Sequence, residues 1–355
     1  MLDLEKIIKN KILKLGSISL MEFLTLVLYH HEKGYYSKSN IIGKKGDFIT
    51  APEVSQVFGE MIANFIALNA KKIIKYEDLC LTELGPGYGT LMKDILRTLK
   101  KIDGQLYQAL QDIYFLEQTK GFKKILKKKF MTANFLSNII DLPNSHNIII
   151  ANEFFDALPQ NQYVYKNKAW HEKRITLDKN NNFRFYLSEK KVVKNKFFPA
   201  EAKENEVFEF SQQLANILLY IFKRINLHGG ILLIIDYCKN KESKSGSLKT
   251  ILKHKHVDLF FSLGASDISF SVDLEIIRRL AEEENCLTFG PADQGIFLRN
   301  LGANERFKNL IMYNPEREKE LTYQKNMLIN KENMGEVFKV FAVTSKSYNN
   351  LYGFA

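Results

Sequence analysis

The stretch that most constrains the fold of this chain is residues 79–100, where a short apolar run leads through a glycine-rich turn into a helical pattern. The run contains an acid, Glu83, and Gly85, Gly87 and Gly89 follow at alternate positions before apolar residues recur at helical spacing. A turn without side chains lets a ligand lie against the backbone, and the first turn of the helix offers it unpaired N–H groups. The pattern therefore predicts a strand, a turn suited to a ligand, and a helix.

The spacing of these glycines excludes the dinucleotide fingerprint G-x-G-x-x-G, because its third glycine would fall at Thr90. The string present is E-x-G-x-G-x-G, with Pro86 inside it. It resembles motif I of the S-adenosylmethionine (SAM) dependent methyltransferases with the seven-strand α/β fold. A glycine turn between a strand and a helix also arises where the helix simply packs closely on the sheet. The motif alone leaves both alternatives open.

Composition excludes several other classes of protein. No apolar run approaches the ~18 residues of a membrane-spanning helix, so we expect no membrane span. Three isolated cysteines without C-x-x-C spacing argue against a metal or disulfide framework. Asp3 and Glu5 precede any arginine, and there is no apolar signal core. These features favour a bacterial cytoplasmic location over the mitochondrial matrix.

The net charge of +11 raises the question of a nucleic-acid partner. The lysines are spread over the whole length, and only residues 123–129 form a tight basic run. Apolar residues interleave that run at helical spacing, which is typical of a solvated helix face. We therefore expect no nucleic-acid partner.

A second acid stands at the end of the next predicted strand. Residues 113–117 form a short apolar run that ends in Glu117. A carboxylate in this place can accept two hydrogen bonds from a ribose diol, as the corresponding acid does in dinucleotide folds. The alternative is an exposed glutamate at a strand end.

Several separate blocks occur in an order that is similar to the MidA-like methyltransferase family. They are residues 34–60, E-L-G-P-G-Y-G-T from Glu83, A-N-E-F-F-D-A-L-P from Ala151, and blocks at 264–268 and 294–298. The resemblance implies an α/β fold, the class I seven-strand (Rossmann-like) SAM methyltransferase sheet, with N-terminal helices and an inserted antiparallel β/helical module. It also implies SAM as cofactor and S-adenosyl-L-homocysteine as product. Mitochondrial members of the family assist assembly of respiratory complex I by methylating an arginine.

The resemblance assigns two parts of the chain to the cofactor. The glycine turn with its two strand-end acids would hold SAM, and the glycine-rich loop before residue 60 would cover it. The cofactor-binding candidates are Glu83, Gly85, Pro86, Gly87, Gly89, Glu117, Gly46, Thr50, Pro52 and Glu53.

Polar residues after another predicted strand are candidates for catalysis. Residues 148–151 predict a buried strand, and Asn152, Glu153 and Asp156 follow it beside two phenylalanines. Carboxylates can hold a guanidinium through paired, charge-assisted hydrogen bonds, and aromatic faces can cover it. In the alternative, Asp156 caps a turn and Asn152 satisfies backbone groups at the strand end. With the family resemblance, we interpret these residues as a guanidinium clamp.

Asp236 and His254 complete the catalytic candidates. Asp236 ends the strand predicted at 229–237, and His254 stands where a family histidine does. Many family members carry Gly-His after the Asp-Tyr at this strand end, whereas Cys238 and Lys239 stand here. The paired-glutamate hairpin of other arginine methyltransferases has no evident counterpart. No metal is expected, because methyl transfer from a sulfonium needs none.

We expect four segments along the chain. Helices are predicted at 4–15, 20–31 and 208–226, and the last strand, at 338–344, is expected to run antiparallel because of the family resemblance. The segments are N-terminal helices and a cofactor-covering loop at 1–60, the first part of the methyltransferase domain at 61–160, an inserted β/helical substrate-docking module at 161–228, and the second part of the methyltransferase domain at 229–355.

The leading hypothesis is a SAM-dependent protein arginine N-methyltransferase whose acceptor is a partner protein such as a complex I subunit. One alternative is a non-catalytic complex I assembly factor that acts through the inserted module. Another is an RNA methyltransferase, which only the basic charge favours. The sequence is also compatible with an oligomer.

Overall fold

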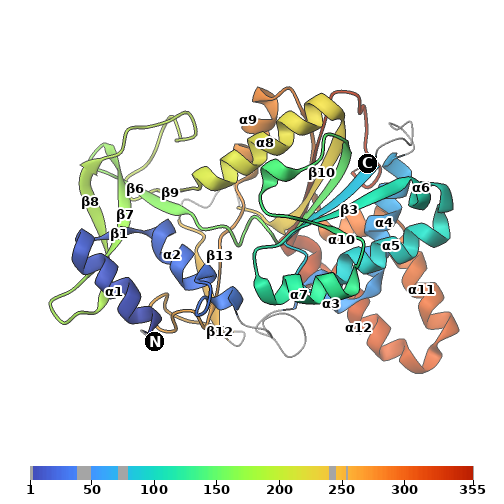
Figure 1. Ribbon diagram of the computed structural model, residues 1–355, viewed down its shortest axis with the longest axis horizontal. Helices are drawn as coiled ribbons and strands as arrows, with labels where there is room; N and C mark the ends of the chain where they lie inside the picture. Colours follow the sequence, from blue (N-terminus) through green and yellow to red (C-terminus); the bar gives the residue numbers. More distant parts are fainter. Residues whose placement is uncertain (1–2, 38–48, 71–78, 240–244, 253–254, 355) are drawn as a thin grey trace.

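The computed structural model describes residues 3–37, 49–70, 79–239, 245–252 and 255–354. In the right half of Figure 1 lies a seven-stranded sheet with the order β14-β15-β10-β5-β2-β3-β4. Strands β10, β5, β2, β3 and β4 run parallel, and β15 is antiparallel to both of its neighbours. The expected class I sheet and its antiparallel last strand are confirmed. Its strands are β2 (Leu79–Leu84), β3 (Leu110–Leu116), β4 (Asn134–Leu136), β5 (His146–Asn152), β10 (Gly230–Tyr237), β14 (Leu287–Asp293) and β15 (Phe338–Thr344).

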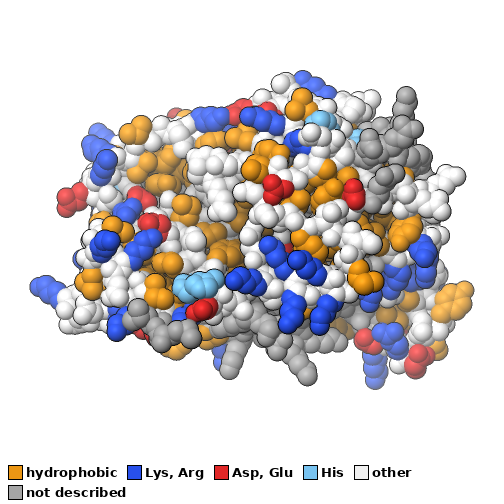
Figure 2. Space-filling view, in the orientation of Figure 1, with side chains coloured by type: hydrophobic (Ala, Val, Ile, Leu, Met, Phe, Trp, Pro, Cys, Tyr) orange, Lys and Arg blue, Asp and Glu red, His pale blue; other side chains and the backbone are white. Residues whose placement is uncertain are grey.

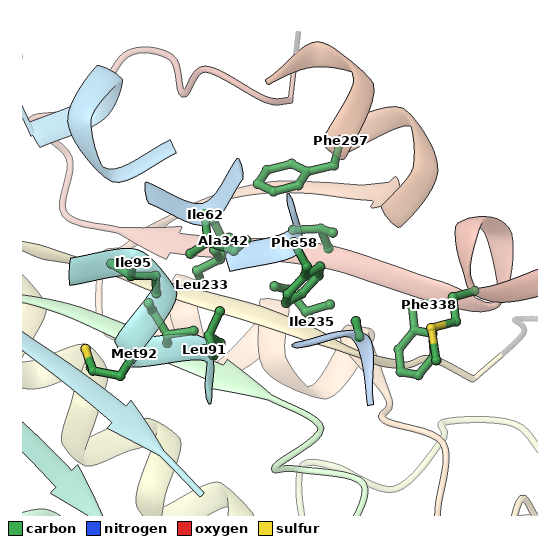
Figure 3. Close-up of a cluster of buried hydrophobic side chains, with 14 of the residues drawn as sticks. Phe58, Ile62, Leu91, Met92, Ile95, Leu233, Ile235, Phe297, Phe338 and Ala342 are labelled. Carbon is green, nitrogen blue, oxygen red and sulfur yellow. The ribbon is translucent and has the colours of Figure 1, made fainter. Parts of the chain in front are cut away.

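Alternate residues of the central strands face two separate cores, because successive side chains of a strand point to opposite faces. In β10, Leu233 and Ile235 belong to the core that also holds Phe58 and Ile95 from the helices on one face (Figure 3). Leu232 and its alternate neighbours belong to the core on the other face. Both faces of the strand are buried, which explains its uninterrupted apolar sequence.

Helices cover both faces of this sheet (Figure 1). Residues of α4 and α5 share one core with the sheet, and residues of α8 and α9 share the other. The helices around the sheet are α3 (Ala51–Val54), α4 (Gln56–Ala70), α5 (Thr90–Ile102), α6 (Gly104–Ala109), α7 (Lys120–Lys129), α8 (Gln212–His228), α9 (Leu274–Glu283), α10 (Gln294–Asn300), α11 (Ala303–Tyr313) and α12 (Glu318–Ile329), with short turns η2 (Ile139–Asp141), η3 (Pro315–Arg317) and η4 (Lys331–Gly335).

A smaller antiparallel sheet occupies the left half of Figure 1. Its order is β1-β7-β6-β9, with β8 paired to β7. Trp170 is 1% exposed and packs edge-on against Tyr165, Phe198 and Phe208, so it is a core residue of this sheet. The strands are β1 (Ile18–Ser19), β6 (Asn161–Lys166), β7 (Ala169–Leu177), β8 (Phe183–Lys191) and β9 (Val207–Phe210).

The N-terminal helices pack beside this smaller sheet, and β1 pairs with β7. Helix α1 (Leu4–Leu15) has the predicted bounds, and α2 (Leu20–Tyr29) ends two residues before the predicted end. Ser19 caps α2 through a capping box with Glu22. A short turn, η1 (Tyr35–Ser37), follows. The N-terminal segment and the inserted strands therefore form one structural layer.

The helix predicted at 208–226 is wrong at its start. Phe208 and Phe210 lie in β9, which pairs with β6, and the helix begins only after Ser211, whose side chain accepts a hydrogen bond from the backbone N–H of Leu214. Pairing with the neighbouring strand overrides the local helical pattern at these positions. The helix itself, α8, shares the core on one face of the large sheet.

A third, three-stranded sheet was not anticipated from the sequence. It has the order β12-β11-β13, with β11 (Lys249–Leu252), β12 (Lys255–His256) and β13 (Asp267–Ser269). Its strands are short, and their sequences carry little periodicity. Phe260, between β12 and β13, packs edge-on against Phe23 of α2.

The basic run forms the exposed face of α7. Lys124, Lys127 and Lys128 are exposed, whereas Phe122 and Leu126 are buried beneath them. Figure 2 shows a gathering of Lys and Arg side chains over this helix. The interpretation as a solvated helix face is in agreement with this arrangement. Among the described helices, none has the length and apolar character needed to span a membrane.

Candidate active site

The glycine turn joins β2 to α5 in a backbone conformation that favours glycine. Gly85, Gly87 and Gly89 have φ angles of 66°, 52° and 68°. The backbone N–H of Gly85 donates to the carbonyl of Leu116 at 3.0 Å, which ties the turn to the neighbouring strand β3. A Cβ at these positions would be strained because φ is positive. The predicted strand, turn and helix are present.

Close packing also explains part of this motif. A Cβ at Gly89 would lie 2.7 Å from side-chain atoms of Leu126 and Phe130, and a Cβ at Gly85 would lie 3.0 Å from the ring of Phe154. The two interpretations of the motif, a turn suited to a ligand and close packing of the helix on the sheet, are therefore compatible with each other. The outer glycines permit close packing, and the positive φ of all three shapes the turn.

Two buried carboxyl groups flank the turn. Glu83 is 3% exposed, and its Oε2 has no hydrogen-bond partner among the described residues. Burial raises its pKa to about 8, against the lowering effect of Lys129 and the backbone of Met92. Glu117 lies at the end of β3, where its Oε1 accepts a hydrogen bond from the backbone N–H of Thr119 at 2.7 Å. Burial raises the pKa of Glu117, and backbone groups including that of Gly87 oppose the rise.

The segment 50–53 lies between the glycine turn and the second strand end. Pro52 stands in the first turn of α3, and the charge of Glu53 contributes to the raised pKa of Tyr88 in the glycine turn. The backbone N–H of Ala51 lowers the pKa of Glu153 through a hydrogen bond. Thr50 precedes α3 as its N-cap residue. The structure thus brings this segment to both predicted sites; Gly46 lies outside the described residues.

Glu153 follows β5 in a strained backbone conformation. Its φ is 52°, in the left-handed region that few non-glycine residues adopt. Its backbone N–H donates to the carbonyl of Ile235 at 2.9 Å, and the Nδ2 of Asn152 donates to its Oε1 at 3.1 Å. Burial raises the pKa of Glu153 to about 8, and the charge of Asp156 adds to the rise.

Asp236 holds the backbone of the loop that carries the clamp candidates. Its Oδ2 accepts hydrogen bonds from the backbone N–H groups of Phe155 at 3.1 Å and Asp156 at 3.3 Å, and its Oδ1 accepts one from Tyr237 at 2.8 Å. Burial raises its pKa to about 8. Because both oxygens are used in these bonds, the geometry gives Asp236 a positioning role. His254, the remaining catalytic candidate, lies outside the described residues.

Asp267 of β13 joins this group of acids, although the sequence analysis did not single it out as catalytic. Burial, followed by the charges of Asp236 and Asp267, raises the pKa of Asp156. The backbone N–H of Phe270 donates to the carbonyl of Asp156 at 3.0 Å, which connects the segment after β13 to the loop. The block G-A-S-D-I at 264–268, which resembles the family, contains Asp267 and could have identified it as a candidate. We call Glu153, Asp156, Asp236 and Asp267 the acidic cluster.

Tyrosines from two other parts of the chain line the acidic cluster. Tyr29 donates from its hydroxyl to the carbonyl of Ala157 at 2.9 Å, and its ring stacks on Tyr36 at 5.2 Å between centroids. Burial raises the pKa of Tyr29, Tyr36 and Tyr237, and the charge of Asp156 contributes in all three. The N-terminal helix α2 is therefore part of the site, which the sequence did not indicate.

Among the described residues, no Lys or Arg forms an ion pair with Glu153, Asp156 or Asp236 of the acidic cluster. No group of three or more His, Cys, Asp or Glu that could hold a metal ion occurs among the described residues. Asp156 and Asp236 are buried, and Glu153 is half-buried. Carboxyl groups close together in such surroundings are unfavourable unless they lose charge or receive a positive partner. The site is suited to a cationic ligand.

Residues 60–292 match the model of the family described as "Putative S-adenosyl-L-methionine-dependent methyltransferase". The chain belongs to this family. As a SAM-dependent methyltransferase it takes SAM as its cofactor, and the expected MidA-like membership is confirmed.

Relatives of this methyltransferase extend over nearly its whole length. The Homo sapiens protein arginine methyltransferase NDUFAF7, mitochondrial, is 30% identical over 94% of this chain and 81% of its own length. The Danio rerio protein of the same name is 29% identical over 95% of this chain and 86% of its own. A Burkholderia thailandensis structure bound to S-adenosyl-homocysteine has the same fold, with a TM-score of 0.85 and 21% identity over 99% of this chain and 94% of its own.

The residues of the glycine turn fit this methyltransferase cofactor. The unpartnered Oε2 of Glu83 is a buried acceptor that a donor group on a ligand would satisfy. Glu117 stands at the strand end where a ribose diol is bound in related sheets. Gly87 adds no side chain at the middle of the turn, which favours close approach of a ligand to the backbone. The predicted cofactor residues at the turn are thus together, and the acidic cluster adjoins them through Ala51.

Proposed function

We propose that this SAM-dependent methyltransferase acts on an arginine nitrogen of a protein. The observation that carries the proposal is the acidic cluster, which places Glu153 and Asp156 close together without a cation among the described residues. A guanidinium would supply the missing positive charge. It would also donate planar, paired hydrogen bonds to the carboxylates, which a lysine ammonium cannot do in the same geometry.

The names of the relatives support the same acceptor. Proteins that match more than nine-tenths of this chain are named protein arginine methyltransferases. Helix α2 borders the acidic cluster through Tyr29, and β1 just before it pairs with β7 of the inserted sheet, so a protein segment would reach the clamp across these elements. A respiratory complex I subunit is the partner that we propose, because of the family resemblance.

The acidic cluster can perform two tasks in such a reaction. The bound cofactor supplies an electrophilic methyl group on a sulfonium, so the protein has to align the acceptor nitrogen and exclude water. Glu153 and Asp156 would hold the guanidinium by hydrogen bonds to its N–H groups. The nitrogen loses a proton as its new bond to carbon forms. A carboxylate of Asp156 or Glu153, each with a raised pKa, is a suitable acceptor for that proton.

Labelled SAM added to an extract of cells that lack the protein tests this proposal. Purified wild-type chain should transfer label to protein, and protease should remove the label. Label removed by nuclease would instead support the RNA alternative. Absence of any label would support the non-catalytic alternative.

Mass spectrometry then tests the acceptor. In extracts with the wild-type chain, the modified peptide should carry its added methyl on arginine. Complex I subunits should be compared with and without the protein. A methyl group on lysine or on a carboxylate would contradict the proposed clamp.

A further inference from the structure

A cavity of 530 Å³ lies between the inserted sheet and the small sheet of β11 and β12. Its lining comes from β6, β7, β8, β9, β11 and β12, and from the segments just before β11 and just after β12. Lys173, Lys249 and His256 contribute basic side chains, and Asp258 is the one acid among the described residues of the lining. The volume lies in the range of sites that hold small ligands or a few side chains.

Lys173 is a half-buried ammonium at this cavity without a carboxylate within ion-pair distance among the described residues. Its Nζ donates to Oε1 of Gln162 at 3.0 Å and lies 4.1 Å from the ring centroid of Phe185. Burial lowers its pKa, because the charged form loses hydration, and the charge of Glu209 opposes this shift. An ammonium has three donors, and the hydrogen bond to Gln162 uses one of them.

Asp258 in the cavity lining and Glu209, which bonds the lining residue Gln162, are already engaged. Glu209 accepts from Nε2 of Gln162 at 2.8 Å and from the backbone N–H and hydroxyl of Ser247 at 2.8 and 2.6 Å. Asp258 accepts from the backbone N–H of Phe260 at 2.8 Å, in a turn of its own. These bonds hold both carboxylates in place at the cavity wall. The charge of Glu209 acts on Lys173, but no ion pair joins the two side chains. An anion that enters the cavity would give the Lys173 ammonium a direct partner.

The cavity and the acidic cluster share a wall. In the β11–β13 ladder, Ile251 pairs with Asp267 and Lys249 pairs with Ser269. The Nζ of Lys249, which lines the cavity, lies 5.9 Å from the ring centroid of Tyr237, a neighbour of the cluster.

A second connection runs through the segment after β13. The backbone N–H of Ser271 donates to the hydroxyl of Ser247 at 2.9 Å, beside the cavity, and the N–H of Phe270 donates to the carbonyl of Asp156 at 3.0 Å. Adjacent residues thus connect to the cavity wall and to the clamp. One extended substrate segment would span both sites, with a cation in one and an anion in the other.

We propose that this cavity is a specificity subsite that binds an acidic side chain of the substrate protein, near in sequence to the methylated arginine, with Lys173 as the binding cation. This inference rests on the proposed protein substrate. It explains why a basic cavity adjoins an acidic one. Opposite charges in neighbouring pockets would also reject a substrate segment bound in the reverse direction.

A peptide library tests the subsite. Each peptide carries one central arginine in a neutral background, with one glutamate placed at each flanking position in turn, and a glutamine peptide as its matched partner. Binding to the full chain with S-adenosyl-homocysteine is measured by fluorescence anisotropy. At one position or two adjacent positions, glutamate should bind about tenfold more tightly than glutamine, the gain expected of one partly desolvated ion pair.

Variants assign that preference to Lys173. Lys173→Met should reduce the preference for glutamate to near unity, and Lys173→Arg should retain most of it. Lys191→Met removes an exposed lysine from β8 and is the matched control that should change nothing. The wild-type comparison of glutamate with glutamine needs no variant, so it stands even if Lys173→Met does not fold. A library without any glutamate preference, or a preference unchanged in Lys173→Met, would overturn the inference.

Methylation of the same peptides separates this inference from the proposed function. Arginine methylated without any glutamate preference would overturn the subsite and leave the methyltransferase proposal intact. Glutamate-dependent binding in which arginine is never methylated, and in which lysine replaces arginine without loss of affinity, would overturn the arginine assignment and leave the acid-binding subsite intact.

Discussion

The carboxylate of Asp236 on β10 accepts a hydrogen bond from the backbone N–H of Asp156, 80 residues earlier in the chain, at 3.3 Å. Through this bond and the one from Phe155 at 3.1 Å, one strand end of the sheet sets the conformation of the loop that follows the neighbouring strand. The clamp candidates therefore depend on an acid that uses its own oxygens for backbone groups. Variants can test whether Asp236 positions the loop while Glu153 and Asp156 bind the acceptor.

Asp236→Asn should lower both stability and methyl transfer. In Asp236, one carboxylate oxygen accepts from the backbone N–H of Phe155 and the other from that of Tyr237. The amide of asparagine has one acceptor oxygen, so its NH2 group would face one of these donors. Loss of acceptors for buried donors costs about 1–3 kcal/mol, which denaturant unfolding measures. The affinity for SAM, measured by calorimetry, should change little. Normal methyl transfer by Asp236→Asn would show that the loop does not need this support.

Glu153→Gln and Asp156→Asn should each reduce kcat/KM for the protein substrate by roughly 100-fold, because each removes a charged acceptor and a proton acceptor from the site. The double variant should be less than additive, since the two groups act on one guanidinium. Calorimetry with S-adenosyl-homocysteine serves as the control for the cofactor site. Unchanged transfer with intact cofactor binding would rule out the clamp.

Gly87→Val should weaken SAM binding by roughly 100-fold or more. A β-branched residue at a φ of 52° is strained and would alter the backbone conformation of the turn. Gly121→Val is the matched control, because a Cβ at Gly121 meets nothing within 4 Å. Calorimetry of the two variants should show loss of affinity only in Gly87→Val. Equal affinities would contradict the cofactor assignment of the turn.

The stability of the ligand-free protein should fall as pH rises from about 4.5 to about 8. Burial raises the pKa of Glu83 and Glu153 to about 8, so in this window the folded protein holds protons that the unfolded chain has lost. The stabilisation is complete below the unfolded pKa and is lost as pH passes the folded one. Thermal unfolding at several pH values measures this slope.

Glu153→Gln should flatten that dependence, because the amide does not titrate. If the slope of the variant equals that of the wild type, the raised pKa of Glu153 does not contribute to the stability of the protein.

Local patterns predicted most of the large sheet. The apolar runs at 79–84, 148–151 and 231–235 are strands in the structure, and the glycine turn between β2 and α5 has the expected form. These elements can be predicted from the sequence because a strand buried on both faces must be apolar throughout, and a turn with positive φ must be rich in glycine. The predicted helix at 208–226 was wrong at its start, since β9 depends on its partner β6 rather than on its own pattern.

The chain's sequence by itself determined the strand-turn-helix unit, the strand-end acids Glu117, Glu153 and Asp236, and the family. Tertiary structure alone decided that Tyr29, Asp267 and Asp156 meet at one site. It also decided that Lys173 faces a cavity beside that site. The physical reason is that a local pattern reports the burial of its own element. Which side chains from distant elements come together depends on how the three sheets pack, and short strands such as β13 carry no periodicity that shows it in advance.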